Sequence, residues 1–422
     1  MIHSEDFKAR YREHEKDFTR NRILTFVGLV VSQLNLLSKS LSVEVSRFVE
    51  RFFGEEKDYS KQAYSQCRKK LKAEAFTALN QGLVGQYYAD GDYVTWQDYL
   101  LLAVDGSLLQ LPESAELIAS FGLAENKGKS MPMGRSSLLY DVKNELMLDA
   151  LLQPYTSSEQ DMALEHLNCL PALSLPACCL LLFDRGYPSL WLLACLQSRQ
   201  LDFVMRCNAN FLMEVSAFAQ ASTPDMLLEL DLELGNRLRK QKLQSFLHPG
   251  QTKLWVRAVK VELASGETEY LLTSLQQLPL ADFQQLYHQR WGVETGLDFY
   301  KNVLQLENFS AKTKLGIQQD FQAHLLAANL SALLVADANQ ELELEQARKH
   351  HKHGYKVNKA VALGLVKDHL ASLLLGKQPT EEVYERLKQK IKRRKEAIRP
   401  NRSFPHKRKL RYKYHLNKRP VL

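Results

Sequence analysis

The stretch Leu175–Gly186, LPACCLLLFDRG, decides the fold class. Its apolar run follows a proline, ends before a glycine, and is too short for an isolated helix. A continuous apolar run of this length is typical of a strand buried on both faces of a sheet. Asp184 stands directly after this run. We therefore expect a sheet covered by helices, with an acid at the end of one buried strand.

The same kind of pattern lies on both sides of this strand. Upstream, LLLAVDGSLLQL (100–111) and SSLLYDVKNELMLDALLQPY (136–155) predict three strands, with a polar turn at 143–145. A helix is expected from Ser158 to Leu170. Downstream, PSLWLLACLQSRQ predicts a helix and LDFVMRC a strand. Strands followed by alternating helices and strands predict an α/β fold with a mixed sheet.

The rest of the chain divides by pattern. Polar sequence from 209 to 267 leads to a predicted hairpin, LWVRAVKVEL and EYLLTSL, which suggests an insertion rich in strands. Helical periodicity dominates before residue 95 and again from 280 to 388. The expected parts are a helical N-terminal domain (1–95), a core in two pieces (96–208 and 268–386), the β-rich insertion (209–267) and a tail (387–422).

Three helices are expected near the N-terminus, at 23–34, at 43–53 and beginning at Ser60. On the third helix, Lys61, Arg68 and Lys72 are expected within about 40° of each other around the axis. A short helical bundle with such a basic edge could dock on DNA. A solvated helix face explains the same pattern, and the sequence leaves both interpretations open.

The charge of the chain is unevenly distributed. The net charge is +8, yet residues 388–422 alone contain fifteen Lys or Arg and a single acid, Glu396. A basic block with interleaved aromatic residues suits nucleic-acid phosphates, although a solubilising tail is the plainer alternative. No apolar run approaches the roughly 18 residues of a membrane span, and no export signal is present. Six cysteines without CxxC spacing favour a reduced, cytoplasmic protein.

Two acids follow apolar runs. Asp105 comes after LLLAV and Asp184 after CCLLLF, so each is expected at the end of a buried strand. Ligands bind beyond strand ends in open sheets, and paired carboxylates suit Mg²⁺. Asp-Gly and Asp-Arg-Gly are also ordinary turn sequences, so a purely structural role remains the alternative for each.

A third acid lies in the segment YHQRWGVETGLDFYK, residues 287–301. On one continuous helix, Tyr287, Arg290, Glu294 and Lys301 would share about 60° of arc beside an apolar face. The flanking cations would keep the acid ionised and could hold phosphates beside it. A surface ladder of ion pairs would have the same pattern.

Three motifs together resemble a known family. They are Asp105-Gly106-Ser107, Asp184-Arg185-Gly186-Tyr187 and Tyr287-x2-Arg290-x3-Glu294-x6-Lys301. They resemble the DDE transposases of bacterial insertion sequences, in the branch named for insertion sequence four. The similarity extends from Phe18 to Asn358, and Ser107 keeps the hydroxyl of the threonine that often follows Asp-Gly in this family.

The resemblance implies a ribonuclease-H-like core interrupted by a β-rich insertion domain, with a helical N-terminal DNA-binding domain. Asp105, Asp184 and Glu294 would be the catalytic acids and would hold two Mg²⁺ or Mn²⁺ ions. Cleavage through a DNA hairpin intermediate is expected from the branch, which calls for an aromatic side chain to stack an extruded base. The candidates for that stacking are Trp291, Trp255 and Tyr270, and the other expected DNA contacts are Tyr287, Arg290, Lys301 and Arg206.

The resemblance also sets the expected partners. These are inverted-repeat transposon ends and target DNA, bound by a homodimer in a synaptic complex, with no membrane and a cytoplasmic, nucleoid-associated location. Two alternatives remain: a catalytically silent DNA-binding protein derived from a transposase, and a ribonuclease-H-like nuclease that cuts RNA–DNA hybrids.

Overall fold

The computed structural model describes residues 1–20, 23–35, 40–54, 56–126, 129–233, 237–263, 266–298, 306–348, 353–375 and 380–399. The chain forms two compact units. The helical unit comprises Met1–Gly82, Leu109–Gly134 and Asp298–Leu422, and the sheet unit comprises Leu83–Leu108 and Arg135–Leu297. The boundaries predicted from the sequence divide the chain differently, and they stay predictions.

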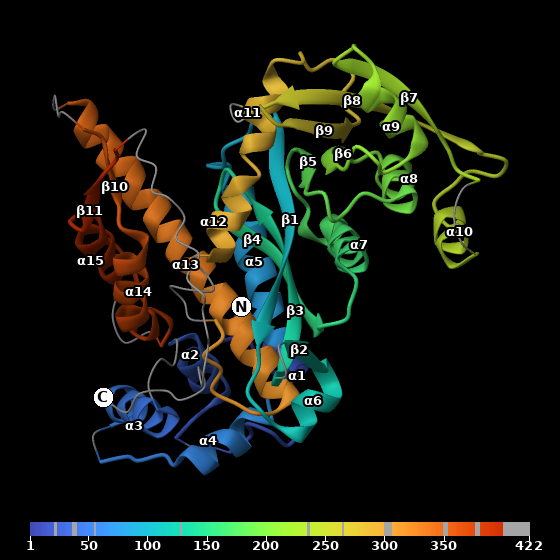
Figure 1. Cartoon of the computed structure of the whole chain (residues 1–422). Coiled ribbons are helices and arrows are strands. Elements are labelled where there is room, and N and C mark those ends of the chain that lie inside the picture. Colours follow the sequence, from blue (N-terminus) through green and yellow to red (C-terminus); the bar gives the residue numbers. More distant parts are fainter. Residues whose placement is uncertain are drawn as a thin grey trace. The chain divides into compact units, whose positions relative to one another are not determined.

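A mixed sheet forms the frame of the sheet unit, with the strand order β3-β1-β5-β6-β9-β8-β7 and with β4 also paired to β3 (Figure 1). β1, β5 and β6 are parallel neighbours, whereas β9, β8 and β7 continue the sheet in antiparallel pairs. This arrangement agrees with the predicted α/β class and is consistent with a ribonuclease-H-like fold. The strands are β1 (Tyr99–Gln110), β3 (Lys129–Asp141), β4 (Leu146–Pro154), β5 (Cys178–Phe183), β6 (Asp202–Cys207), β7 (Asp225–Asp231), β8 (Lys253–Glu262) and β9 (Thr268–Thr273).

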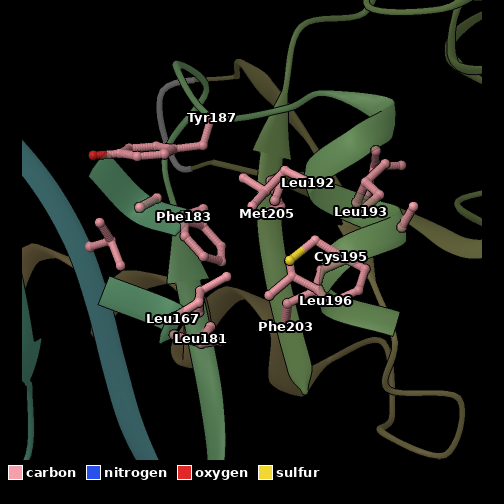
Figure 2. Packing of buried hydrophobic residues seen from close by; sticks show 14 of the residues in the cluster. Leu167, Leu181, Phe183, Tyr187, Leu192, Leu193, Cys195, Leu196, Phe203 and Met205 are labelled. Carbon is pink, nitrogen blue, oxygen red and sulfur yellow. The ribbon is translucent and has the colours of Figure 1, made fainter. Parts of the chain in front are cut away.

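The strand that decided the fold class lies where the sequence predicts it. β5 has neighbours on both sides, and its residues Leu180–Phe183 are buried. Helix α8 (Leu190–Ser198) packs Leu192 and Leu196 among the side chains of β5 and β6 (Figure 2). Helix α7 (Glu159–Cys169) lies in the segment where the sequence predicts a helix. Ser158 caps it by accepting a bond from the Asp161 N–H, and a short 3₁₀ helix, η1 (Leu170–Leu173), follows its end.

In its described part, the segment 209–267 contains helices as well as the expected strands. It contains α9 (Met213–Gln220), β7, α10 (Arg237–Gln244) and β8, and the predicted β8–β9 hairpin is present. It does not form a sheet of its own, because β9 pairs with the edge of β6 through Val204–Cys207 and so adds the hairpin to the central sheet. The hairpin is therefore an extension of the sheet, which satisfies the hydrogen-bonding edge of β6. The insertion domain at 209–267 stays a prediction.

The helical unit contains the N-terminal and C-terminal helices. The three helices predicted near the N-terminus are α2, α3 and α4, and Ser60 caps α4 by accepting a bond from the Ala63 N–H. The elements are α1 (Glu5–Tyr11), α2 (Phe26–Leu34), α3 (Leu41–Phe53), α4 (Lys61–Arg68), the start of α5 (Glu74–Asp90), α6 (Ala115–Phe121), β2 (Leu123–Asn126), α13 (Lys314–Ala347), β10 (Tyr355–Val357), α14 (Lys359–Leu374), α15 (Thr380–Lys392) and β11 (Lys395–Ala397).

Helix α13 is the longest described element, with 34 residues. Among the described residues, only this helix is long and apolar enough to cross a membrane, and 67% of its most apolar window is buried inside the protein. It packs with α2, α14 and α15. This burial is typical of the core helix of a folded unit, because the apolar residues of such a helix contact protein on most sides.

Candidate active site

The first two candidate acids occupy equivalent positions on neighbouring parallel strands. β1 and β5 pair from Tyr99↔Cys178 to Val104↔Phe183, and Asp105 and Asp184 are the next residues on each strand. Adjacent strands lie about 4.8 Å apart, so the two aspartates are near neighbours. Asp184 ends its strand as predicted. Asp105 does not, because β1 continues to Gln110.

The Asp105 carboxyl is affected by both other acids. Burial raises the pKa of Asp105 to about 6, the Gly106 N–H and the Arg290 guanidinium counteract this rise, and the negative charges of Glu294 and Asp184 add to it. The Gly106 N–H donates to Asp105 Oδ1 at 2.8 Å. The three predicted acids therefore share one electrostatic neighbourhood, and a cation there would relieve their repulsion.

The helix that was expected over residues 287–301 is interrupted. Helix α11 (Asp282–His288) ends, and α12 (Trp291–Asp298) begins only after a two-residue turn. Within the turn, the Arg290 N–H donates to Tyr287 O at 3.0 Å, and the Val293 N–H donates to Arg290 O at 3.0 Å. Such bonds between residues three apart tighten the helix and align residues i and i+3. The prediction of one continuous helix is therefore wrong. Tyr287 and Arg290 nevertheless lie on the same side of the turn.

Arg290 is buried, with 2% of its surface exposed. Its Nη2 donates to Glu294 Oε1 at 2.7 Å, whereas its Nε and Nη1 have no hydrogen-bond partner among the described residues. Burial opposes the charge, but the Tyr287 hydroxyl and the carboxylates of Glu294 and Asp184 raise the pKa of Arg290 above its ordinary value. The guanidinium stays charged and keeps two buried donors for an acceptor such as a phosphate oxygen.

Asp184 is contacted by two of the predicted DNA-binding residues. The Tyr287 hydroxyl donates to Asp184 Oδ1 and lies equally close to Phe183 O, at 3.3 Å in each case. Arg206 Nη1 lies 3.8 Å from Asp184 Oδ1 and pairs with Glu269 at 3.0 Å. Burial raises the pKa of Tyr287, so this hydroxyl stays protonated and donates. These residues hold the carboxylate of Asp184 in place.

One carboxylate that the sequence did not single out lies beside the glycines that follow Asp105 and Asp184. Glu159 begins α7, and an added Cβ would lie 3.2 Å from its Oε1 at Gly106 and 3.2 Å from its Oε2 at Gly186. Arg135 Nη1 donates to Glu159, and Gln160 Nε2 donates to Gly186 O at 3.3 Å. The start of α7 therefore packs against Gly106 in strand β1 and against the turn that follows Asp184. Its capping sequence predicts the helix start but not these contacts.

Tyr187 closes the turn at Asp184, because its N–H donates to Asp184 O at 3.1 Å. The side chain is 1% exposed, its ring packs on Phe183 with centroids 5.4 Å apart, and its hydroxyl has no hydrogen-bond partner among the described residues (Figure 2). Burial raises the pKa of Tyr187, and the charges of Asp105 and Glu159 raise it further. The hydroxyl is therefore neutral and lies near the acids.

The remaining predicted residues are only partly accounted for. Lys301 lies outside the described residues, and of Trp291 only the backbone, at the start of α12, is described. The basic edge predicted on the third helix is wrong. Helix α4 ends at Arg68, which is buried at 5% exposure and pairs with Asp320, and Lys72 lies beyond the helix and donates to Arg10 O. The helical pattern of the sequence continues past Arg68, so it did not predict that helix α4 ends there.

The kind of metal that the acids would suit follows from their oxygens. Carboxylates are hard ligands that suit Mg²⁺ or Mn²⁺. The pKa of Asp105 is raised mainly by burial and further by the charges of Glu294 and Asp184, which a divalent ion would offset. Within the described ranges, however, no group of three or more His, Cys, Asp or Glu side chains is close enough to hold an ion. The donor set fits such an ion in its chemistry, while the carboxylates would have to draw closer to share it.

The stretch of the chain that carries these motifs matches one known protein family. The profile of the transposase DDE domain family matches residues 96–330. No curated protein sequence matches the chain. Among solved structures, the chain is similar to a piggyBac transposase synaptic complex with hairpin DNA determined by cryo-electron microscopy, with 12% identity and a TM-score of 0.46, covering 90% of this chain and 79% of that chain.

Proposed function

Because the chain belongs to the transposase DDE domain family, we propose that it is the transposase of an insertion sequence. It binds the ends of the element and cuts and joins DNA strands by metal-dependent phosphoryl transfer. The spacing of Tyr287, Arg290 and Glu294 further assigns it to the insertion-sequence-four branch. Cleavage then passes through a hairpin intermediate.

One observation supports this proposal most. Asp105 and Asp184 follow the last paired residues of neighbouring parallel strands, and Glu294 lies near enough to raise the pKa of Asp105. The charges of Asp184 and Glu294 therefore raise the pKa of Asp105 at the point where β1 and β5 stop pairing, although the three acids are far apart in sequence. A purely structural role does not explain why the fold keeps mutually repelling carboxylates together.

The residues of the site have distinct roles in this reaction. Asp105, Asp184 and Glu294 would hold Mg²⁺ or Mn²⁺, two ions per site, which supply activation of a water or 3′-hydroxyl and stabilisation of the leaving oxygen. The free Nε and Nη1 donors of Arg290 bind a phosphate oxygen beside these acids. Tyr287 orients the Asp184 carboxylate by donating to it.

A hairpin requires that a base be unstacked and held by an aromatic side chain, because unstacking costs a few kcal/mol. Of the described candidates, Trp255 on β8 is 51% exposed, whereas Tyr270 packs its ring against Phe218 at 6.5 Å. We assign the stacking role to Trp255. Lys301 and Trp291 remain proposed DNA contacts from the motif alone.

The partners follow from the reaction. The N-terminal helices and the basic tail would bind the inverted-repeat ends, and the active site would engage target DNA. Two ends must be brought together, so a homodimer is proposed. We also propose a cytoplasmic location with the nucleoid, because DNA is the proposed substrate.

The test is a cleavage assay on DNA that flanks the gene. The parent protein is expected to nick or cut the element ends only with Mg²⁺ or Mn²⁺, and Asp184→Asn is expected to abolish cutting while retaining DNA binding. Cutting that persists in Asp184→Asn would remove this acid from the mechanism.

The same assay separates the alternatives. Binding of DNA by the parent protein without any metal-dependent cutting would indicate a silent transposase derivative. Preferential cleavage of an RNA–DNA hybrid would instead indicate a nuclease of the same fold.

A further inference from the structure

A second possible binding site lies in the helical unit, apart from the acids. A cavity of about 460 Å³ is lined by α4, by the segment 309–313 and by the first turn of α13. Its volume lies within the roughly 300–1,000 Å³ of typical ligand sites. Its walls combine apolar side chains with the hydroxyl-bearing residues Ser40, Ser65 and Ser310.

The walls are strongly basic. Lys61, Lys69 and Lys312 line the cavity, all three are exposed, and no described carboxylate pairs with their ammonium groups. None of the described lining residues is acidic. Three cations without partners around a concave surface create a positive potential that attracts an anion.

The cavity is rigidly built. Arg68, on its wall, donates to Gly316 O at 2.8 Å, to Asp320 Oδ1 at 2.9 Å and to Gln319 Oε1 at 2.9 Å. These buried bonds join the end of α4 to the start of α13. Because Asp320 neutralises Arg68, the arginine fixes the frame and the lysines supply the net charge.

In the first turn of α13, two backbone N–H groups that could bind an anion are already hydrogen-bonded. Thr313 caps the helix by accepting from the Gly316 N–H at 3.2 Å, and Glu116 accepts from the Lys314 N–H at 2.8 Å. The Thr313 hydroxyl and Glu116 therefore already occupy part of the helix end. The lysine side chains are the groups that remain able to bind an anion.

We propose that this cavity binds the DNA backbone, with Lys61, Lys69 and Lys312 each contacting a phosphate. The inference rests on the proposed function, since the protein's substrate there is DNA. Lysine binds phosphate as a point charge and requires no base sequence, so the site positions the duplex rather than reading it. Of the three residues of the predicted basic edge, Lys61 and Arg68 line this cavity, but only Lys61 is among the lysines that we propose contact phosphate.

The test compares two triple variants of the full chain on a mixed-sequence duplex. In the first, Lys61, Lys69 and Lys312 become Ala. In the control, Lys16, Lys57 and Lys356 become Ala; these are exposed lysines of the same unit that do not line the cavity. Thermal unfolding of both variants is expected to match the parent, because all six side chains are exposed.

The salt dependence of affinity is the readout. Each lost phosphate contact reduces the slope of log affinity against log salt by about 0.9, so the pocket variant should lose roughly two to three units of slope and at least about tenfold in affinity. The control should keep the slope of the parent. Equal slopes in the two variants would overturn the proposal that these lysines bind phosphate. In that case, metal-dependent cutting by the parent protein would still support the proposed function.

Discussion

Replacing Asp105 by Asn should stabilise the metal-free protein while it abolishes cleavage. Burial raises the pKa of Asp105 from 3.8 to about 6, so the folded state disfavours the ionised carboxyl. A raised acid pKa means that stability falls as pH rises from about 4 to about 6 and stays low above that range. Two pKa units correspond to about 3 kcal/mol, and because Asp105 keeps some exposure we expect about 1–3 kcal/mol.

The assay is urea unfolding of the parent and Asp105→Asn without metal at about pH 4 and about pH 7. The variant should be more stable at the higher pH, and the difference should shrink at the lower pH. Asp225→Asn is the control, because Asp225 accepts from Arg257 Nε at 2.9 Å and Nη2 at 2.6 Å and its loss should destabilise the protein. A difference between parent and Asp105→Asn that is absent, or that does not change with pH, would refute the reasoning.

Three further variants test other parts of the structure. Glu159→Gln should lower metal affinity and cleavage by roughly 10–100-fold, as changes beside metal ligands do. Cleavage equal to that of the parent would mean that the contacts of Glu159 beside Gly106 and Gly186 are dispensable. Arg68→Ala should cost about 3 kcal/mol in urea unfolding, because the buried Asp320 loses its cation; a loss below about 1 kcal/mol would contradict that pairing. Trp255→Ala should leave stability unchanged but weaken binding of hairpin DNA by about 1–3 kcal/mol, and unchanged affinity would point to another aromatic residue.

Local patterns predicted the elements near the acids. β5 was recognisable because it is buried on both faces, and α4 and α7 were recognisable because Ser60 and Ser158 are good N-caps. Asp184 was placed correctly since a strand end and a turn are both local features. The pairing of the β8–β9 hairpin with β6 was not predictable, because nothing in a strand's own sequence names its neighbour.

The errors arose where tertiary contacts override periodicity. Arg68 fits a solvent-facing position on a helical wheel, yet Asp320, which lies 252 residues away in sequence, neutralises it in the interior. The turn at Arg290 interrupts a helix whose sequence has no proline there. Glu159 could not be assigned from sequence, because its contacts with Gly106 and Gly186 depend on how three separate segments fold together.

The most direct test of the account locates the metal. Crystals of the protein with Mn²⁺ and a DNA end should give an anomalous peak among Asp105, Asp184 and Glu294, with all three carboxylates as ligands. Metal bound elsewhere, or a peak whose ligands omit Glu294, would contradict the claim that these acids form one catalytic centre.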